Sequence, residues 1–307
     1  MTFVPTAIDL SQIPPPAAIE PLDYETLRGV GVARFKSQWE TARALDPTLP
    51  SYDVDMLETD PAMIAIEAWS YIRLLDRARV NDAIKAVLAP LAKGSDLDNI
   101  VARVNVSRLT IVPANGPTPA VMETDAQLLR RYLLAFDRPS AGSPDRYIYE
   151  ALTAVPTLQD VAVIGRAIHG RLGDVDLVIS GPAGAAPTSD QIAAVSAAVT
   201  ATNVKPEATS VSVVPAVRNL YTLSAVVEIP RGPDPNVVIA SARAAMTLAT
   251  ASRLLIGAEV PIWSVAGSAY GPNVIRVTAV SPPSDIPADP YTIPVCTGIN
   301  ITAQVQA

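Results

Sequence analysis

The feature that most constrains the fold is a long helical pattern over residues 60–89, whose apolar positions do not keep to one stripe. Asp60 is a residue type that caps helices, and Pro61 is favoured at the first helical position. Pro90 weakens the far end, and we predict Gly94 as the C-cap. Because apolar residues occur on several faces, this helix requires packing partners on more than one side. Those apolar residues are Ile64, Ile66, Trp69, Ile72, Leu75, Val80, Ile84, Val87 and Leu88.

A band of charged and polar residues interrupts the apolar pattern between positions 73 and 82. Charged side chains in such a band can form ion pairs that set the register between packed helices. The alternative is that the band is a solvated face of the chain's own fold. Together with two apolar neighbours, the band supplies the predicted partner-binding residues, which are Trp69, Ile72, Arg73, Asp76, Arg77, Arg79, Asn81 and Asp82.

The pattern of the chain changes near residue 155, where single strands begin to alternate with helices. We predict an extended Pro-rich arm over 1–22, which is either disordered or laid along another surface, and a helical region over 23–155. An α+β domain over 156–217 and a second α+β domain over 218–307 follow. The expected fold class is therefore α+β, with long bundle helices in the N-terminal half and small α/β sandwich domains after it.

The individual elements follow from periodicity, caps and breakers. Thr124 with Gln127 forms a capping box, which begins one of the helices. The expected helices are 23–46, 60–89, 96–104, 125–136, 145–154, 189–202, 236–254 and 262–269. The expected strands are 161–164, 175–180, 209–217, 221–229, 274–280 and 299–305.

Composition excludes several classes of protein. Hydrophobic residues make up 49% and charged residues 17% of the 307 positions, which is too apolar for a disordered chain. The net charge of −7 and the lack of a basic run argue against nucleic-acid binding. The single cysteine, Cys296, allows no disulfide within the chain and no thiolate metal site. The start of the sequence is not a secretory signal, and no apolar stretch reaches the length of about 18 residues that spans a membrane.

The sequence predicts no catalytic residue, no metal and no cofactor. The only histidine, His169, is expected in a solvent-exposed loop, and no nucleophile elbow accompanies it. An acidic cluster could bind Ca²⁺, but it lacks the glycine and the final glutamate of an EF-hand, so a solvated cap region is favoured. Two of the three tryptophans fall on helices, which favours core packing over a sugar-binding platform. The acidic cluster is Asp53, Asp55, Glu58 and Asp60, and the tryptophans are Trp39, Trp69 and Trp263.

Several short motifs follow one another in order along nearly the whole chain. They are residues 8–16 (IDLSQIPPP), 19–25 (IEPLDYE), 68–69 (AW), 77–83 (RARVNDA), 92–98 (AKGSDLD), 123–125 (ETD) with 130–131 (RR), 140–143 (SAGS) with Tyr147, 204–206 (VKP), and a helix containing Ala240 and Ala245. In this order they resemble the baseplate J family of contractile tails. One departure is the segment 109–122, which is short and rich in proline.

The resemblance implies a non-enzymatic structural component of the baseplate wedge, in a phage or a phage-derived tailocin. It implies a heterotrimeric wedge of two copies of this chain with one smaller I-type tail protein, joined through a bundle of N-terminal helices. C-terminal contacts between copies would close a ring around the central hub, and the ring would couple baseplate change to sheath contraction. The sheath-initiator and hub or spike proteins are further implied partners, and assembly is expected in the bacterial host cytoplasm.

Two alternatives from other functional classes stay open. A tail-tip carbohydrate hydrolase would need a pocket with two close carboxylates. A tail-fibre-like binding protein would show repeats and trimeric β-rich segments, and the sequence displays neither.

Overall fold

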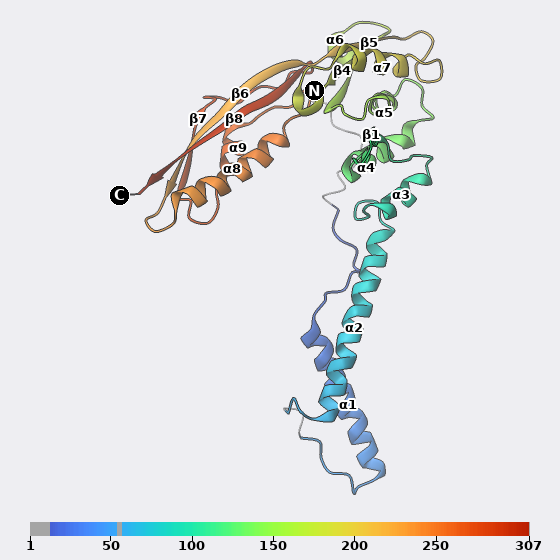
Figure 1. Cartoon of the computed structure of the whole chain (residues 1–307), viewed down its shortest axis with the longest axis vertical. Helices are drawn as coiled ribbons and strands as arrows, with labels where there is room; N and C mark the ends of the chain where they lie inside the picture. Colours follow the sequence, from blue (N-terminus) through green and yellow to red (C-terminus); the bar gives the residue numbers. More distant parts are fainter. Residues whose placement is uncertain (1–12, 54–56, 307) are drawn as a thin grey trace. The chain divides into compact units, whose positions relative to one another are not determined.

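The computed structural model describes residues 13–53 and 57–306 (Figure 1). Contacts divide the described chain after Arg103 into a helical unit (residues 13–103) and an α+β unit (residues 104–306). Helix covers 42% and strand 21% of the chain, which confirms the mixed α+β class. The finer division into an arm, a helical region and two α+β domains stays a prediction.

The helical unit consists of α1 (Tyr24–Leu45), α2 (Pro61–Ala86) and α3 (Ser95–Ala102). The Asp60 side chain accepts hydrogen bonds from the N–H groups of Ala62 and Met63, which confirms the predicted start of α2. Helix α1 packs against α2. Gly31 permits this close approach, because a Cβ there would lie 2.8 Å from the Ile66 side chain.

The C-terminal end of α2 differs from the prediction. The helix ends at Ala86, and turns replace the last expected residues. Pro90 lacks an N–H donor and disfavours helical geometry in the residue before it, so the helix stops well ahead of it. Gly94 is not the C-cap of α2: it precedes α3 as the N-cap, with a φ of 52° that favours glycine.

The α+β unit begins with a short hairpin and two helices. Strands β1 (Thr110–Val112) and β2 (Val121–Met122) pair antiparallel, and neither was expected from the sequence. Helix α4 (Asp125–Leu134) starts at the Thr124 capping box as predicted, and its last turn continues as η2 (Ala135–Asp137). Helix α5 (Pro144–Ala154) follows.

The first sheet has the strand order β3-β4-β5. Its strands are β3 (Asp160–Ile164), β4 (Asp174–Ser180) and β5 (Ser210–Pro215), and the intervening helical segments are α6 (Arg166–His169), η3 (Pro182–Gly184) and α7 (Ser189–Val199). Strand β5 is parallel to β4, so the chain needs the α7 crossover to reach it. Helix α5 packs on β3 and α7 packs on β5, and Leu177, Val178 and Ile179 at the centre of β4 are buried.

The second sheet has the order β7-β6-β8 and is built around one long strand. Its strands are β6 (Val217–Ile229), β7 (Arg276–Ser281) and β8 (Thr292–Val305), and its helices are α8 (Pro235–Ala251) and α9 (Ile262–Gly267). Strand β8 runs parallel beside β6 along the whole length of β6 (Figure 1). Helix α8 packs on β8, and α9 packs on β7.

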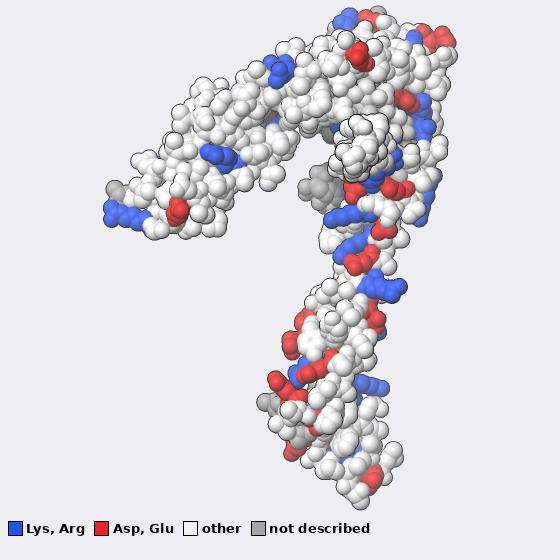
Figure 2. Space-filling view, viewed as in Figure 1, with Lys and Arg blue, Asp and Glu red and all other residues white. Residues whose placement is uncertain are grey.

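The last strand is twice as long as the sequence pattern indicated, because it begins at Thr292 rather than at residue 299. Its first half joins a core cluster with residues of β3 and β4, through Ile293 and Val295. Figure 2 shows that charged side chains are sparse over this second sheet and its helices on the face in view, whereas they are frequent along the helical unit.

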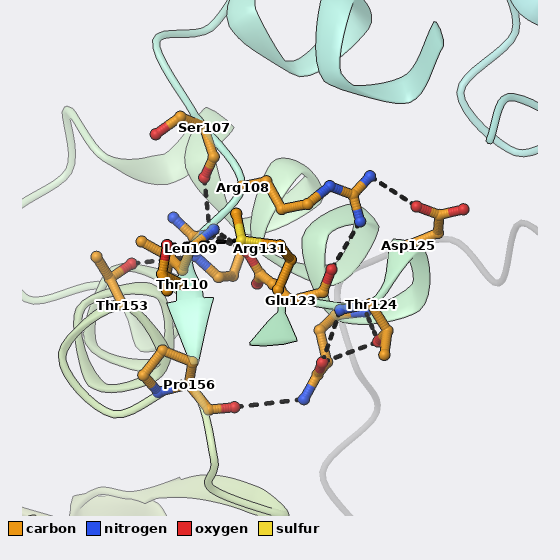
Figure 3. Close-up of polar contacts among 12 residues, drawn as sticks. Ser107, Arg108, Leu109, Thr110, Glu123, Thr124, Asp125, Arg131, Thr153 and Pro156 are labelled. Carbon is orange, nitrogen blue, oxygen red and sulfur yellow. Dashed lines mark hydrogen bonds and ion pairs between the residues drawn. The ribbon is translucent and has the colours of Figure 1, made fainter. Parts of the chain in front are cut away.

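A buried ion pair organises the start of the α+β unit (Figure 3). Arg131 of α4 and Glu123 lie 2.6 Å apart, with side-chain exposures of 4% and 1%. The same Glu123 oxygen accepts the Leu109 N–H, at 3.1 Å. Arg131 also donates to the Ser107 carbonyl and to the Thr153 hydroxyl of α5. The Arg131 guanidinium therefore connects α4 with α5 and with the segment that contains Ser107.

A second buried carboxylate connects the two sheets. Asp176 of β4 accepts hydrogen bonds from Arg171 and from the hydroxyl of Tyr291, each at 2.6 Å, and Tyr291 immediately precedes β8. Burial raises the pKa of Asp176, but the hydrogen bonds from Tyr291 and Arg171 outweigh it, so that this pKa lies below its ordinary value.

We expect Arg131→Met to destabilise the protein by about 3–5 kcal/mol, because it leaves the Glu123 carboxylate buried without its cation. Arg276→Met is the matched control, since Arg276 is 72% exposed and lies 3.9 Å from Glu228. The control should cost about 0–1 kcal/mol. Urea unfolding, followed by circular dichroism, measures both. Equal stability of the two variants would show that the buried pair does not organise this unit.

A pH series tests the Asp176 contact. Because its pKa is lowered in the folded state, the carboxylate contributes stability above the ordinary aspartate pKa of about 3.9, and this contribution is lost as the pH falls through the folded value. Asp176→Asn should therefore be about 1–3 kcal/mol less stable than wild type at pH 7. The difference should shrink below about pH 4. A difference that is constant with pH would contradict this account.

Candidate interaction surface

Helix α2 has one face that is covered within the helical unit. Met63, Ser70 and Asn81 are buried on this face, and their spacing of 7 and 11 residues places them on one side of a helix. The Ser70 hydroxyl donates to the Ile66 carbonyl, so it needs no other partner. Helix α1 packs on α2, and Arg28 of α1 forms an ion pair with Glu67 of α2 at 3.0 Å.

The opposite face of α2 carries large apolar side chains that are about half exposed. At 100° per residue, they fall within an arc of about 100° whose centre lies about 140° around the helix from Met63 and Ser70. We call these four residues the α2 stripe: Ile64 (53% exposed), Tyr71 (57%), Ile72 (57%) and Leu75 (50%). An exposed apolar surface of this kind on a helix is typical of a site for another chain.

The polar band of α2 holds the chain's own arm. Asn81 is 5% exposed. Its side-chain oxygen accepts the Glu20 N–H at 3.1 Å, and its amide nitrogen donates to the Glu20 carbonyl at 2.7 Å. Arg77 donates to the Pro21 carbonyl at 3.2 Å and forms an ion pair with the Glu20 side chain. We call Arg77 and Asn81 the arm clamp, because they hold residues 20–21 along α2.

The structure separates the eight predicted partner-binding residues into three groups. Two of them, Arg77 and Asn81, form the arm clamp. Arg73 pairs with Asp76 at 3.4 Å, and Asp82 pairs with Lys85 at 3.3 Å, all on the exposed surface of α2. The remaining three are exposed: Trp69, Ile72 and Arg79. A partner role for these residues stays a prediction. The sequence prediction omitted Ile64, Tyr71 and Leu75 from this set, although their helical spacing with Ile72 was visible.

Two expectations about single residues were wrong. The tryptophans on helices were predicted to pack in the core, but Trp69 is 46% exposed and Trp263 is 62% exposed. His169 does not lie in an exposed loop, because it ends the short helix α6. Its Nδ1 accepts the Arg171 N–H at 3.0 Å, and its Nε2 is buried.

The acidic segment before α2 has a structural role in the part that can be described. Asp60 accepts the Tyr52 hydroxyl at 2.6 Å and caps α2, and the hydrogen bond from Tyr52 keeps its pKa below the ordinary value. Asp55 lies outside the described residues. Residues 13–53 and 57–306 contain no cluster of histidine, cysteine and carboxylate side chains that could hold a metal ion.

A groove of the α+β unit runs along β3 and has a volume of about 810 Å³. Its carboxylates include Asp160, whose two oxygens are already engaged by Arg130 at 2.7 Å and by the Ile256 N–H at 2.9 Å. This residue therefore fixes the wall of the groove. In the described parts of the chain, no helix has the length and apolar character needed to cross a membrane.

The α2 stripe is the feature expected of a protein that binds other chains. Residues 58–115 match the family model for the baseplate J-like N-terminal domain. The chain is also 30% identical over 308 residues to Baseplate protein J of Escherichia phage P2, and the match covers 94% of this chain and 95% of that protein. The chain therefore belongs to the baseplate J family of structural phage proteins. The matched domain contains α2, and with it the stripe and the arm clamp.

We expect Asn81→Leu to release the arm, because the change removes both hydrogen bonds to Glu20. Two neutral hydrogen bonds are worth about 2 kcal/mol, so hydrogen exchange of a peptide covering residues 13–24 should rise roughly ten- to thirtyfold. Asp82→Asn changes the exposed neighbour and should leave this exchange unaltered. Unchanged exchange in Asn81→Leu would mean that the clamp does not hold the arm in solution.

Proposed function

We propose that the chain is a non-enzymatic structural component of a contractile-tail baseplate wedge, and that the α2 stripe binds a neighbouring chain in that wedge. The observation that carries the proposal is the exposure of four large apolar side chains along one face of α2, inside the segment that matches the baseplate J-like domain. Burying the exposed half of each side chain stabilises a complex by roughly 1 kcal/mol per residue.

In this proposal the wedge is a heterotrimer of two copies of the chain and one smaller I-type tail protein. Helices α1 and α2 contribute to a bundle, in which a helix of the smaller protein covers the α2 stripe. The two-sided apolar character of α2 supports this arrangement, since α1 covers only one of its faces. The arm clamp is then an intrachain contact that shapes the same helix.

The proposal extends to contacts that would hold the wedge within the baseplate. We propose that copies meet through the α+β unit, whose two parts act as small sandwich domains, and close a ring around the central hub and spike. The sheath-initiator protein is a further proposed partner, and the ring couples a change in the baseplate to sheath contraction. Assembly takes place in the bacterial host cytoplasm. A repacking of wedge contacts with two states of similar free energy is the physical requirement for such coupling.

The double variant Ile72→Glu with Leu75→Glu tests the stripe. Both side chains are exposed, so the chain should fold, but the burial of two carboxylates would oppose docking. After expression with the whole tail gene set, a tagged pull-down with mass spectrometry and particle sizing should recover wild type as two copies with one smaller tail chain. We expect the double variant to lose more than nine-tenths of that smaller chain.

Leu45→Glu is the matched control, since Leu45 lies at the end of α1 and is 86% exposed. It should recover the smaller tail chain as wild type does. If the double variant also recovers it fully, the stripe is not the binding surface. A wild-type chain that behaves as a folded monomer without any tail partner would overturn the wedge proposal.

A further inference from the structure

The outer edge of β8 is long, uncharged and open. Strand β8 pairs with β6 on one side, and no strand within the described chain pairs with its other side. No charged residue follows Asp289 in the sequence. Natural proteins protect a free edge with lysine, proline, a bulge or a covering segment, because unpaired N–H and C=O groups attract another strand.

Only the first half of β8 has such protection. It contains Pro294 and a register shift between Cys296 and Gly298, and the Gly257 N–H donates to the Thr292 carbonyl at 2.9 Å. The second half, residues 299–305, contains no proline and no charge, and its register with β6 is regular. This second half is therefore the unprotected part of the edge.

One hydrogen bond shows which main-chain groups face outwards. The Gln306 N–H donates to the Ile229 carbonyl of β6, at 2.9 Å. Because successive residues of a strand direct their N–H and C=O groups to opposite sides, residues 300, 302 and 304 also face β6. The residues whose main-chain groups face the open edge are then Ile299, Ile301, Ala303 and Val305.

We propose that this edge pairs antiparallel with the same edge of a second copy, so that Thr302 lies opposite the partner's Thr302 on a two-fold axis. In this register Ile299 faces the partner's Val305, and Ile301 faces the partner's Ala303. All four outward-facing residues of each copy then exchange hydrogen bonds with the other copy. The result is one continuous six-stranded sheet with an isologous interface.

The side chains are complementary to themselves in this register. On the open face of the sheet, Asn300 lies opposite the partner's Gln304, and threonine lies opposite threonine, which is a favourable cross-strand pair. On the face that α8 covers, aliphatic side chains meet aliphatic side chains. No charge lies opposite a like charge anywhere along the edge, which is why a second copy fits it.

Helix α8 adds a second reason for a second copy. It packs on β8, so pairing of two β8 edges brings two α8 helices next to each other. The solvent side of α8 is mostly small or apolar, with Val237 at 66% and Leu248 at 74% exposure. Its only charged residue is Arg243.

This inference rests on the proposed contact between copies, and it uses a surface separate from the α2 stripe.

Disulfide trapping tests the register. In a Cys296→Ser background of the full chain, Thr302→Cys places two thiols opposite each other in a non-hydrogen-bonded pair, at a spacing that a disulfide can bridge. We expect a covalent dimer on mild oxidation. Asn300→Cys is the matched control and should stay monomeric under the same conditions, since it faces a glutamine.

Charge insertion tests the contact itself. Thr302→Lys puts two ammonium groups opposite each other on the axis, whereas Thr278→Lys puts the same charge at an exposed position of β7. Two differently tagged copies, expressed with the whole tail gene set, report the association through β8. We expect Thr302→Lys to recover less of the second tagged copy than wild type does, because the contact through β8 is lost. Thr278→Lys should recover as much of it as wild type. Both variants should still recover the smaller tail chain.

The outcomes separate this inference from the proposed function. No trapping at position 302, or equal trapping at 300 and 302, overturns the β8 pairing even when the smaller tail chain is recovered. Trapping at 302 without recovery of any tail partner supports the pairing and overturns the wedge proposal instead. Recovery of the second copy by Thr302→Lys in the same amount as by Thr278→Lys also overturns the pairing.

Discussion

The rest of the helical unit depends on one constraint: a helix with apolar residues on opposite faces cannot bury both against a single neighbour. Helix α1 covers the side of α2 that contains Met63 and Ser70. The α2 stripe is left exposed on the other side. The hydrophobic effect would therefore favour the docking of a helix that has a matching apolar face.

Buried polar groups determine which arrangement each unit adopts. A buried polar group that loses its partner costs more than a hydrogen bond gains, so Glu123, Asp176 and Asn81 each restrict the chain to packings that supply their partners. The partners of Glu123 all meet its Oε2, and its Oε1 is buried without a hydrogen bond in the described part of the chain. Glu123 requires Arg131, and Asp176 requires both Arg171 and Tyr291. Asn81 is different, because it satisfies both main-chain groups of one residue in the arm. Asn81 binds only the main chain of residue 20, so the side chain at that position could change without loss of these two hydrogen bonds.

Local signals in the sequence predicted most elements, because caps act within one helical turn. Asp60 and Thr124 marked helix starts that the structure confirms. The misses are contacts or conformations that depend on distant residues. The arm clamp joins residues 61 positions apart, and nothing near Asn81 indicates that partner. The first half of β8 was not predicted, and Pro294 fits there because β6 pairs with only one side of the strand. The exposed apolar face was visible as a pattern, but which residues α1 would leave uncovered was not.

The two proposed interfaces use different physics, and this gives them different specificity. The α2 stripe buries side chains, so any helix with a matching apolar face gains from docking there, and an unlike partner is accommodated as readily as a like one. The β8 edge offers N–H and C=O groups at fixed positions along the strand, so the free energy of pairing depends on a partner strand in one register. Self-complementarity of residues 299–305 selects a like chain for that role. Because the two surfaces belong to separate units and share no residue, their contributions should add, and each contact can form without waiting for the other.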